Sequence, residues 1–182
     1  MNARNSLAAI EELVLDYDYV KDSVLKVDMS VAQNLQRHLT KMLILACASY
    51  YENSIARAIF DYSQNQAKKY CNAPHGFDFV GTYSFFKMFD FGREKLKTVK
   101  EFLGPMNFLG ATFKQSIITE ISQNEEIVRN MQAFQEICSM RNSLAHNDLI
   151  TYSDMSSKSF EEIKGLHDRG VEFLNFLVSK FE

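Results

Sequence analysis

Apolar residues recur every three or four positions along the first part of the chain, which is the pattern of amphipathic helices. One such stripe covers residues 7–27, and a second follows it and extends to about Ile59 or Phe60. The first contains Leu7, Ile10, Val14, Tyr17, Val20, Val24 and Val27, and the second contains Val31, Leu35, Leu39, Met42, Ala46 and Tyr50. Asp28 or Ser30 stands where a side chain would cap the second helix. The spacing therefore predicts a long helical hairpin.

The helical spacing is lost between about residues 66 and 104. Pro74, Gly76 and Gly81 interrupt this segment, and aromatic residues crowd together at Phe77, Phe79, Tyr83, Phe85, Phe86, Phe89 and Phe91. We interpret it as an irregular, aromatic-rich insertion with short helices, the last over about residues 93–103. A further short helix is predicted over about residues 108–121.

Basic residues are interleaved with the aromatics of this insertion, at Lys68, Lys69, Lys87, Arg93, Lys95, Lys97 and Lys100. Such a composition can stack on and neutralise single-stranded RNA. The favoured alternative is that the phenylalanines pack the insertion onto the rest of the protein while the lysines face solvent, because phenylalanine is usually a core residue.

Two more amphipathic helices are predicted in the last third of the chain. Ser122 and Glu125 have the spacing of a capping box, which would open a helix that ends near Asn147. The stripe of that helix contains Ile127, Met131, Phe134, Cys138, Arg141 and Ala145, and a final helix is marked by Phe160, Ile163, Leu166, Leu174, Leu177 and Phe181. With no repeats and no convincing strand pattern, the sequence predicts one all-α domain over residues 1–182, an antiparallel helical bundle interrupted by the insertion.

Composition agrees with a folded helical domain. The chain has 182 residues, 46% of them hydrophobic, with only two prolines and seven glycines. The three cysteines fit neither a disulfide framework nor zinc-ligand spacing, so no metal or cofactor is expected. The longest apolar run, residues 42–48, is too short to span a bilayer, and the N-terminus lacks the apolar stretch of a signal peptide. A cytoplasmic protein with no membrane contact is therefore expected.

The net charge of -3 argues against a dedicated nucleic-acid binder, which usually carries a basic excess. If the chain handles RNA, its positive potential must be local, for example built by bringing two subunits together.

Arg141 is an anomaly on the apolar stripe of its helix. A buried guanidinium is tolerated only when it is paired or directed at a ligand, so Arg141 either bonds a carboxylate at the edge of the core or serves a site. Asn142 and His146 are four residues apart and share a face if the helix continues that far. A cation that holds a phosphate, beside an imidazole that titrates near neutrality, suits phosphodiester cleavage.

The segment Arg141-Asn142-Ser143-Leu144-Ala145-His146 resembles the signature of the HEPN superfamily, an arginine followed after four to six residues by a histidine. The order of a helical hairpin, a variable insertion, a motif helix and a terminal helix is also similar to that family. The chain looks closest to stand-alone bacterial HEPN proteins of the RiboL-PSP-like kind, which are associated with toxin–antitoxin and phage-defence systems.

The resemblance implies a homodimer in which the two motif segments form one cleft, and a metal-independent endoribonuclease that leaves a 2′,3′-cyclic phosphate. On this chain His146 would be the general acid or base, Arg141 would stabilise the phosphorane, and Asn142 would orient the phosphate or the motif. Glu52 and Ser143 are candidate supporting residues, although a solvated or ion-paired Glu52 is the commoner outcome. A cognate antitoxin or regulatory protein is a further expected partner. The alternative function is a catalytically inactive HEPN module for dimerisation or for binding nucleotide or RNA.

Overall fold

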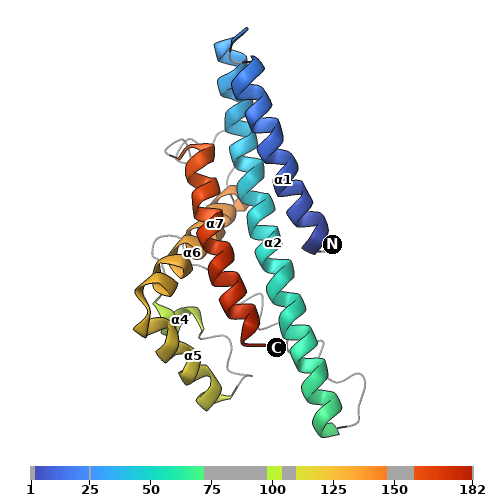
Figure 1. Cartoon of the computed structure of the whole chain (residues 1–182), viewed down its shortest axis with the longest axis vertical. Coiled ribbons are helices and arrows are strands. Elements are labelled where there is room, and N and C mark those ends of the chain that lie inside the picture. Colours follow the sequence, from blue (N-terminus) through green and yellow to red (C-terminus); the bar gives the residue numbers. More distant parts are fainter. Residues whose placement is uncertain (1–2, 25, 72–97, 104–109, 147–157, 182) are drawn as a thin grey trace.

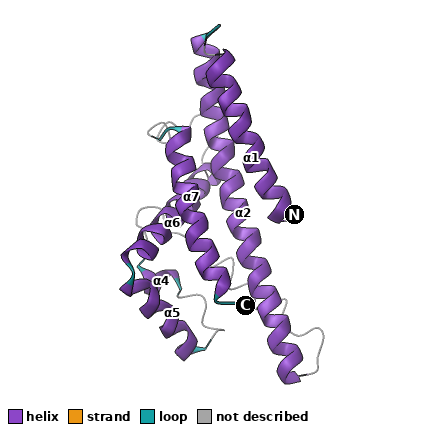
Figure 2. Cartoon of the chain, viewed as in Figure 1, coloured by secondary structure: helices purple, strands orange, loops and turns teal. Residues whose placement is uncertain are grey.

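The computed structural model describes residues 3–24, 26–71, 98–103, 110–146 and 158–181, with side chains for all of these except 3–6, 66–71, 101–102 and 146. Every regular element in these ranges is a helix, and none is a strand (Figure 2). The predicted all-α fold is confirmed. Most of the predicted insertion lies outside the described residues.

The predicted hairpin forms from α1 (Ala3–Tyr19) and α2 (Met29–Cys71), joined through a π-helical turn, η1 (Val20–Val24) (Figure 1). Asp28 caps α2, because its Oδ1 accepts a hydrogen bond from the backbone N–H of Val31 at 3.0 Å. The predicted end of α2 at residue 59 or 60 was wrong. The helix continues for about three further turns because residues 60–71 contain neither proline nor glycine, although their apolar stripe has faded.

The apolar face assigned to α2 was also wrong over much of its length. The face that enters the core carries Leu43, Ile44, Cys47, Tyr51 and Ile55, all with no exposed surface. Val31, Leu35 and Met42, from the predicted stripe, are exposed on the opposite side. The helix is apolar on two opposite faces, and periodicity alone does not say which of them is buried.

The remaining described helices are α4 (Val99–Phe102), α5 (Ala111–Gln123), α6 (Glu125–His146) and α7 (Phe160–Ser179). The cap predicted for the motif helix was misplaced. Ser122 belongs to α5, and Asn124 caps α6 by accepting hydrogen bonds from the backbone N–H groups of Glu126 and Ile127 at 3.0 and 3.3 Å. A single polar residue between two helices is enough to end one and begin the next, and α6 therefore starts two residues later than the capping box implied.

The core lies where α2, α6 and α7 meet, and α1 covers the N-terminal half of α2 (Figure 1). At the start of α7, Ser159 and Glu162 form a capping box. The ring of Tyr17 stacks on Phe160 with centroids 3.9 Å apart, and its hydroxyl donates to the carboxylate of Glu161. These contacts fix α7 against α1 directly after the segment that follows the motif helix. No helix in the described ranges is long and apolar enough to cross a membrane.

Candidate functional site

The motif residues occupy the last turns of α6, which continues without a break to His146. Asn142 and His146 therefore share one face of the helix, as predicted. Arg141 and His146 are about 140° apart around the helix axis and about 7.5 Å apart along it. The side chain of His146 is outside the described part of the chain, so its role stays a prediction.

Arg141 forms an ion pair with Glu52 of α2. Its Nη2 lies 3.0 Å from Oε1 of Glu52 and donates to Oε2 at 3.3 Å. Its Nη1 donates to Oδ1 of Asn142 at 3.1 Å. The guanidinium is thus held from two sides, by a carboxylate from a different helix and by the amide next to it in the sequence. Such a charge-assisted pair fixes the direction of the guanidinium better than a single contact would.

The ion pair lies at the edge of the core, not inside it. The side chains of Arg141 and Glu52 are 34% and 23% exposed. The carboxylate partner foreseen as one explanation for a buried arginine is therefore present, and Glu52 contacts the motif. The remaining exposure also leaves the guanidinium within reach of an external anion, which would have to share it with Glu52.

Burial raises the pKa values of two groups at this ion pair, Glu52 and the neighbouring Cys138. Burial raises the pKa of Glu52 above its ordinary value, while the positive charge of Arg141 opposes that shift. Cys138 lies one turn before Arg141 and is fully buried, and burial raises the pKa of its thiol well above the usual range, helped by the charge of Glu52 and opposed by Arg141. A buried thiol of this kind is unreactive, so Cys138 is a packing residue beneath the site.

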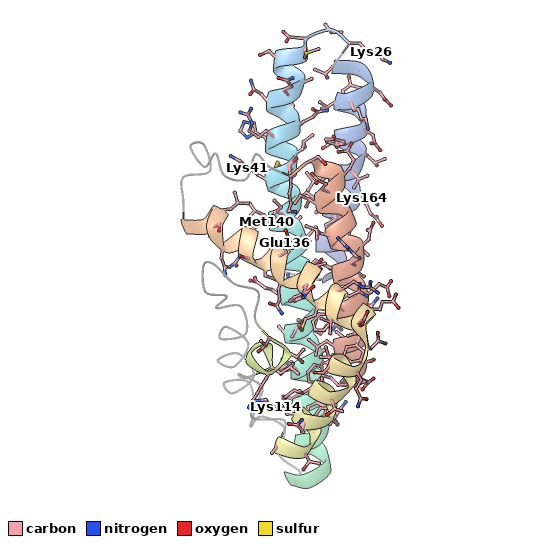
Figure 3. The ribbon with its side chains drawn as sticks, turned by 90° about the vertical axis from the view of Figure 1, so that its left-hand side faces the viewer. Lys26, Lys41, Lys114, Glu136, Met140 and Lys164 are labelled. Carbon is pink, nitrogen blue, oxygen red and sulfur yellow. The ribbon has the colours of Figure 1, made fainter. Side chains whose placement is uncertain are left out.

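α6 crosses α2 close to the motif, and Glu136 and Met140, which precede the motif, are labelled near the crossing (Figure 3). Lys158, two residues before α7, forms an ion pair with Glu136 at 3.0 Å and so links the start of the last helix to α6. Asn142 and Ser143 are half-buried at this crossing, and each makes further interactions. Ser143 is thus adjacent to the Arg141 contacts, and its supporting role remains a prediction.

Sequence reasoning missed Lys41, a buried lysine on α2 that is 6% exposed. Its place on α2, on the N-terminal side of the crossing with α6, is visible in Figure 3. It interacts with other residues. The sequence did hold a signal for Lys41, because this lysine directly precedes the longest apolar run of the chain. A charged side chain in such a place is usually paired. Lys41 lies on the same side of α2 as Glu52, about 20° from it around the helix axis.

The sequence also gave no sign of a buried polar pair formed by Tyr51 and His167. The Tyr51 hydroxyl lies 3.1 Å from Nδ1 of His167 and 3.2 Å from the backbone oxygen of the same residue. The two rings stack with centroids 5.6 Å apart. Burial lowers the pKa of His167 to about 4, so the ring is neutral at physiological pH. Both residues are buried, so this pair belongs to the core.

Two further features considered from the sequence are a metal site and the basic insertion. In the ranges that the structure describes, no His, Cys, Asp and Glu side chains gather into a group that could hold a metal. Of the basic residues predicted in the insertion, only Lys100, an exposed residue of α4, has a described side chain. The others lie outside the described side chains, so an RNA-stacking role for the insertion stays untested.

Comparison with known families gives a match over nearly the whole chain. The model of the family described as RiboL-PSP-HEPN matches residues 5–182. The chain belongs to this family. Neither a curated protein nor a solved structure shows a significant match. The RiboL-PSP-HEPN match spans the hairpin, the motif helix and the terminal helix, so Glu52 and Arg141 meet inside the family's domain.

Proposed function

We propose that this RiboL-PSP-HEPN protein is an endoribonuclease that cleaves RNA through attack of the 2′-hydroxyl on the adjacent phosphorus. The observation that carries the proposal is the placement of Arg141. Its guanidinium is held by Glu52 and Asn142 at the surface end of the helix that finishes at His146. An oriented cation and an imidazole on the same helix end suit phosphodiester cleavage, because one can stabilise negative charge and the other can transfer a proton.

The reaction divides into roles for these side chains. The 2′-oxygen forms a bond to phosphorus as its proton passes to a base, and the bond from phosphorus to the 5′-oxygen breaks as that oxygen receives a proton. The products are a 2′,3′-cyclic phosphate and a 5′-hydroxyl. Arg141 would stabilise the negative charge that gathers on the non-bridging oxygens, and His146 would donate or accept one of the two protons. The resemblance to active relatives supports a reaction that needs no metal.

One imidazole cannot remove a proton and deliver another in the same step, which supports a site built from two copies. Each copy would supply one His146 and one Arg141. Two arginines in one cleft would also concentrate positive charge locally on a protein whose net charge is negative. The proposal therefore includes a homodimer as the active species.

A direct test is cleavage of a defined single-stranded RNA by the purified full chain in excess EDTA. We expect cleavage, with 2′,3′-cyclic phosphate ends identified by mass spectrometry. His146→Ala should lower the rate by at least about 100-fold, the lower range for loss of a general acid or base. Gln132→Ala, at an exposed position of the same helix, is the matched control and should keep the full rate.

The outcomes separate the mechanism from its competitors. Full activity in the His146→Ala variant would remove His146 from the reaction. Cleavage that stops in EDTA and returns with added metal would remove the metal-independent route. Circular dichroism of each variant should match the native chain, so that lost activity is not confused with lost structure.

The second candidate function is an inactive HEPN module that binds nucleotide or RNA. One observation favours it: the charge of Arg141 is already balanced by Glu52. An inactive module would bind RNA without cleaving it, and His146→Ala would leave that binding unchanged. The cleavage assay with a parallel binding measurement distinguishes the two functions.

The biological role proposed with the nuclease is that of a toxin or phage-defence effector, restrained by a cognate antitoxin or regulatory protein. An unrestrained ribonuclease would damage the RNA of its own cell. We expect induced expression of the native chain to stop bacterial growth and the His146→Ala variant to be tolerated at equal protein level. Equal growth arrest by both would contradict this role.

A further inference from the structure

The outer face of α1 carries an apolar centre between two rows of carboxylates. Leu15 and Tyr19 are 70% and 66% exposed, and they lie about 40° apart around the helix. Leu15 is about 160° from both Leu13 and Tyr17, which are buried, so it faces away from the core. We call this surface the acidic face of α1. Its residues are Glu11, Glu12, Leu15, Asp16, Asp18 and Tyr19, all of them exposed.

The carboxylates flank the apolar centre on both sides. Glu11 and Asp18 lie about 60° and 80° around the helix from the midpoint of the two apolar residues. Glu12 and Asp16 lie about 40° and 80° from the same midpoint in the other direction. None of the four carboxylates forms an ion pair with a residue that the structure describes. Within the described ranges, their charges are therefore not neutralised.

These charges are placed against the stability of α1 itself. Glu12 and Asp16 are like charges at positions i and i+4, a pairing that destabilises a helix. The helix has no acidic residue in its first turn, where its dipole would favour one, and no basic residue in its last turn. The acidic residues therefore do not serve the helix, which favours a role in binding.

The charge of this face decides which kind of molecule fits it. RNA and an anionic membrane surface both carry negative charge and would be repelled. A second copy of the chain has a net charge of -3 and presents the same carboxylates. In the described part of the chain, these carboxylates form no group that could hold a metal ion. A protein segment with positive charges around an apolar centre is the complementary occupant.

We propose that the acidic face of α1 binds a basic amphipathic helix of a partner protein. Apolar side chains of that helix pack on Leu15 and Tyr19, and its lysines or arginines pair with the carboxylates on both sides. From Glu11 to Tyr19 the face is about 12 Å long, which is about two helical turns. The matching segment has apolar residues three or four positions apart, with basic residues beside them.

Such a site deepens the proposed function, on which it rests only for its purpose, because it gives the regulatory partner a surface and a chemistry. In Figure 1, α1 and α6 lie on opposite sides of α2. A helix bound to α1 would therefore leave the contact between Arg141 and Glu52 uncovered. The partner would tether the protein through α1, and any block of the motif would have to come from another part of that partner.

A synthetic peptide serves as the probe for this site. It has about 18 residues, with leucine on one helical face and lysine at the other positions, and it carries a fluorescent label. We expect it to bind the full chain with a Kd in the micromolar range at about 0.15 M salt, because one helix face is a small contact. A scrambled peptide has the same charge without the apolar face. In fluorescence anisotropy it should bind at least about tenfold more weakly.

Substitutions on α1 locate the site. Leu15→Ala combined with Tyr19→Ala removes the apolar centre and should lower the affinity for the probe at least about tenfold. Asp16→Lys should also lower it at least about tenfold, because it reverses a charge that faces the peptide. Glu172→Lys is the matched control, because it makes the same charge change at an exposed position of α7. It should lower the affinity less than about twofold, since salt screens a distant charge. Circular dichroism reports whether each variant keeps its helices.

Carbodiimide crosslinking maps the contact directly, because the reagent joins a lysine to a carboxylate that it touches. Mass spectrometry of the crosslinked and digested complex should find the probe attached to Glu12, Asp16 or Asp18. Attachment mainly to carboxylates outside the acidic face of α1 would overturn the assignment.

Other results would also overturn the proposal. Equal binding of the scrambled peptide, or equal losses from Asp16→Lys and Glu172→Lys, would mean a general attraction to an acidic protein. Binding to phosphatidylglycerol vesicles that the double alanine variant loses would assign the face to a membrane. Self-association that the same variant loses in sedimentation equilibrium would assign it to a second copy.

The probe assays use no RNA, so the binding site and the nuclease are tested separately. Probe binding at α1 without RNA cleavage would overturn the nuclease and leave the binding site. RNA cleavage without probe binding would do the reverse.

Discussion

The Nη2 atom of Arg141 lies 3.0 Å from the Oε1 atom of Glu52, and this contact joins two helices at positions 89 residues apart in the sequence. It places the cation of the motif where α6 crosses α2. The same contact balances the charge of the arginine, so an RNA phosphate has to compete with a carboxylate for it. Glu52 is thus expected both to orient Arg141 and to weaken ground-state binding of RNA.

The first prediction concerns Glu52→Gln. The amide keeps a hydrogen-bond acceptor for Arg141 but removes the negative charge, so one more full positive charge is available to phosphate. RNA affinity should rise, and the slope of log affinity against log salt should steepen by up to about one unit. The rate at which bound RNA is cleaved should fall, because the guanidinium of Arg141 is held less firmly. Fluorescence anisotropy in a salt series and single-turnover cleavage measure the two effects.

The matched control for Glu52→Gln is Asp61→Asn, at an exposed carboxylate of the same helix that pairs with Arg57. It makes the same charge change away from the motif and should leave the affinity nearly unchanged. Equal tightening by both variants would mean that net charge, not the Arg141 contact, controls binding. Both variants should lower the free energy of unfolding by less than about 1 kcal/mol, as expected for partly exposed pairs.

The second prediction compares Asn124 with Ser122. Asn124 accepts two backbone hydrogen bonds at the start of α6, whereas Ser122 is an exposed residue inside α5. Asn124→Ala should lower the free energy of unfolding by about 1 kcal/mol. Ser122→Ala should be neutral or slightly stabilising, because alanine is the better helix former. Urea denaturation of both variants decides the matter, and a larger loss from Ser122→Ala would contradict the assignment of the cap.

The difference between these two residues shows what sequence reasoning can reach. The period of apolar residues found the helices, and the local motif found Arg141 and Asn142, because these signals are repeated or close in the sequence. Glu52, 89 residues from Arg141, became a candidate only through the resemblance to the HEPN family. The choice between Asn124 and Ser122, and between the two apolar faces of α2, depends on which neighbours pack against them. The Tyr51 and His167 pair depends on tertiary contact in the same way. His146 is placed on its helix by the sequence and the structure alike, and its chemistry is still to be tested.

The third prediction concerns acid stability and His167. Burial lowers the pKa of His167 from 6.5 to about 4, so in this interval the unfolded chain binds a proton that the folded chain does not. The free energy of unfolding should therefore fall as pH falls from about 6.5 to about 4, by roughly 3 kcal/mol from this group. Above pH 6.5 the group contributes no pH dependence.

A His167→Phe variant tests that assignment. The ring can still stack on Tyr51, and the hydroxyl of Tyr51 can still donate to the backbone oxygen of residue 167. The variant should lose most of the pH dependence of stability between pH 4 and 6.5 in urea denaturation. An unchanged slope would show that other groups, such as the carboxylates, cause the loss of stability in acid.

The fourth prediction compares two glycines of α7. A Cβ built at Gly170 would meet the hydroxyl oxygen of Tyr51 and lie 2.9 Å from its Cζ atom, whereas a Cβ at Gly165 meets nothing within 4 Å. Gly170→Ala should therefore lower the free energy of unfolding by about 1–3 kcal/mol, the usual effect of overpacking a core. Gly165→Ala should raise it by about 0.5–1 kcal/mol through its better helix propensity.

Removing the hydroxyl should separate overpacking from other effects of Gly170→Ala. In a Tyr51→Phe background the nearest atom to the new methyl group is gone, so Gly170→Ala should destabilise the protein less than it does in the native chain. A double-mutant cycle by urea denaturation at pH 7 gives this coupling. If Gly170→Ala lowered the free energy of unfolding equally in both backgrounds, the hydroxyl of Tyr51 would not occupy the space above Gly170. The described packing of α7 on α2 would then be wrong at that position.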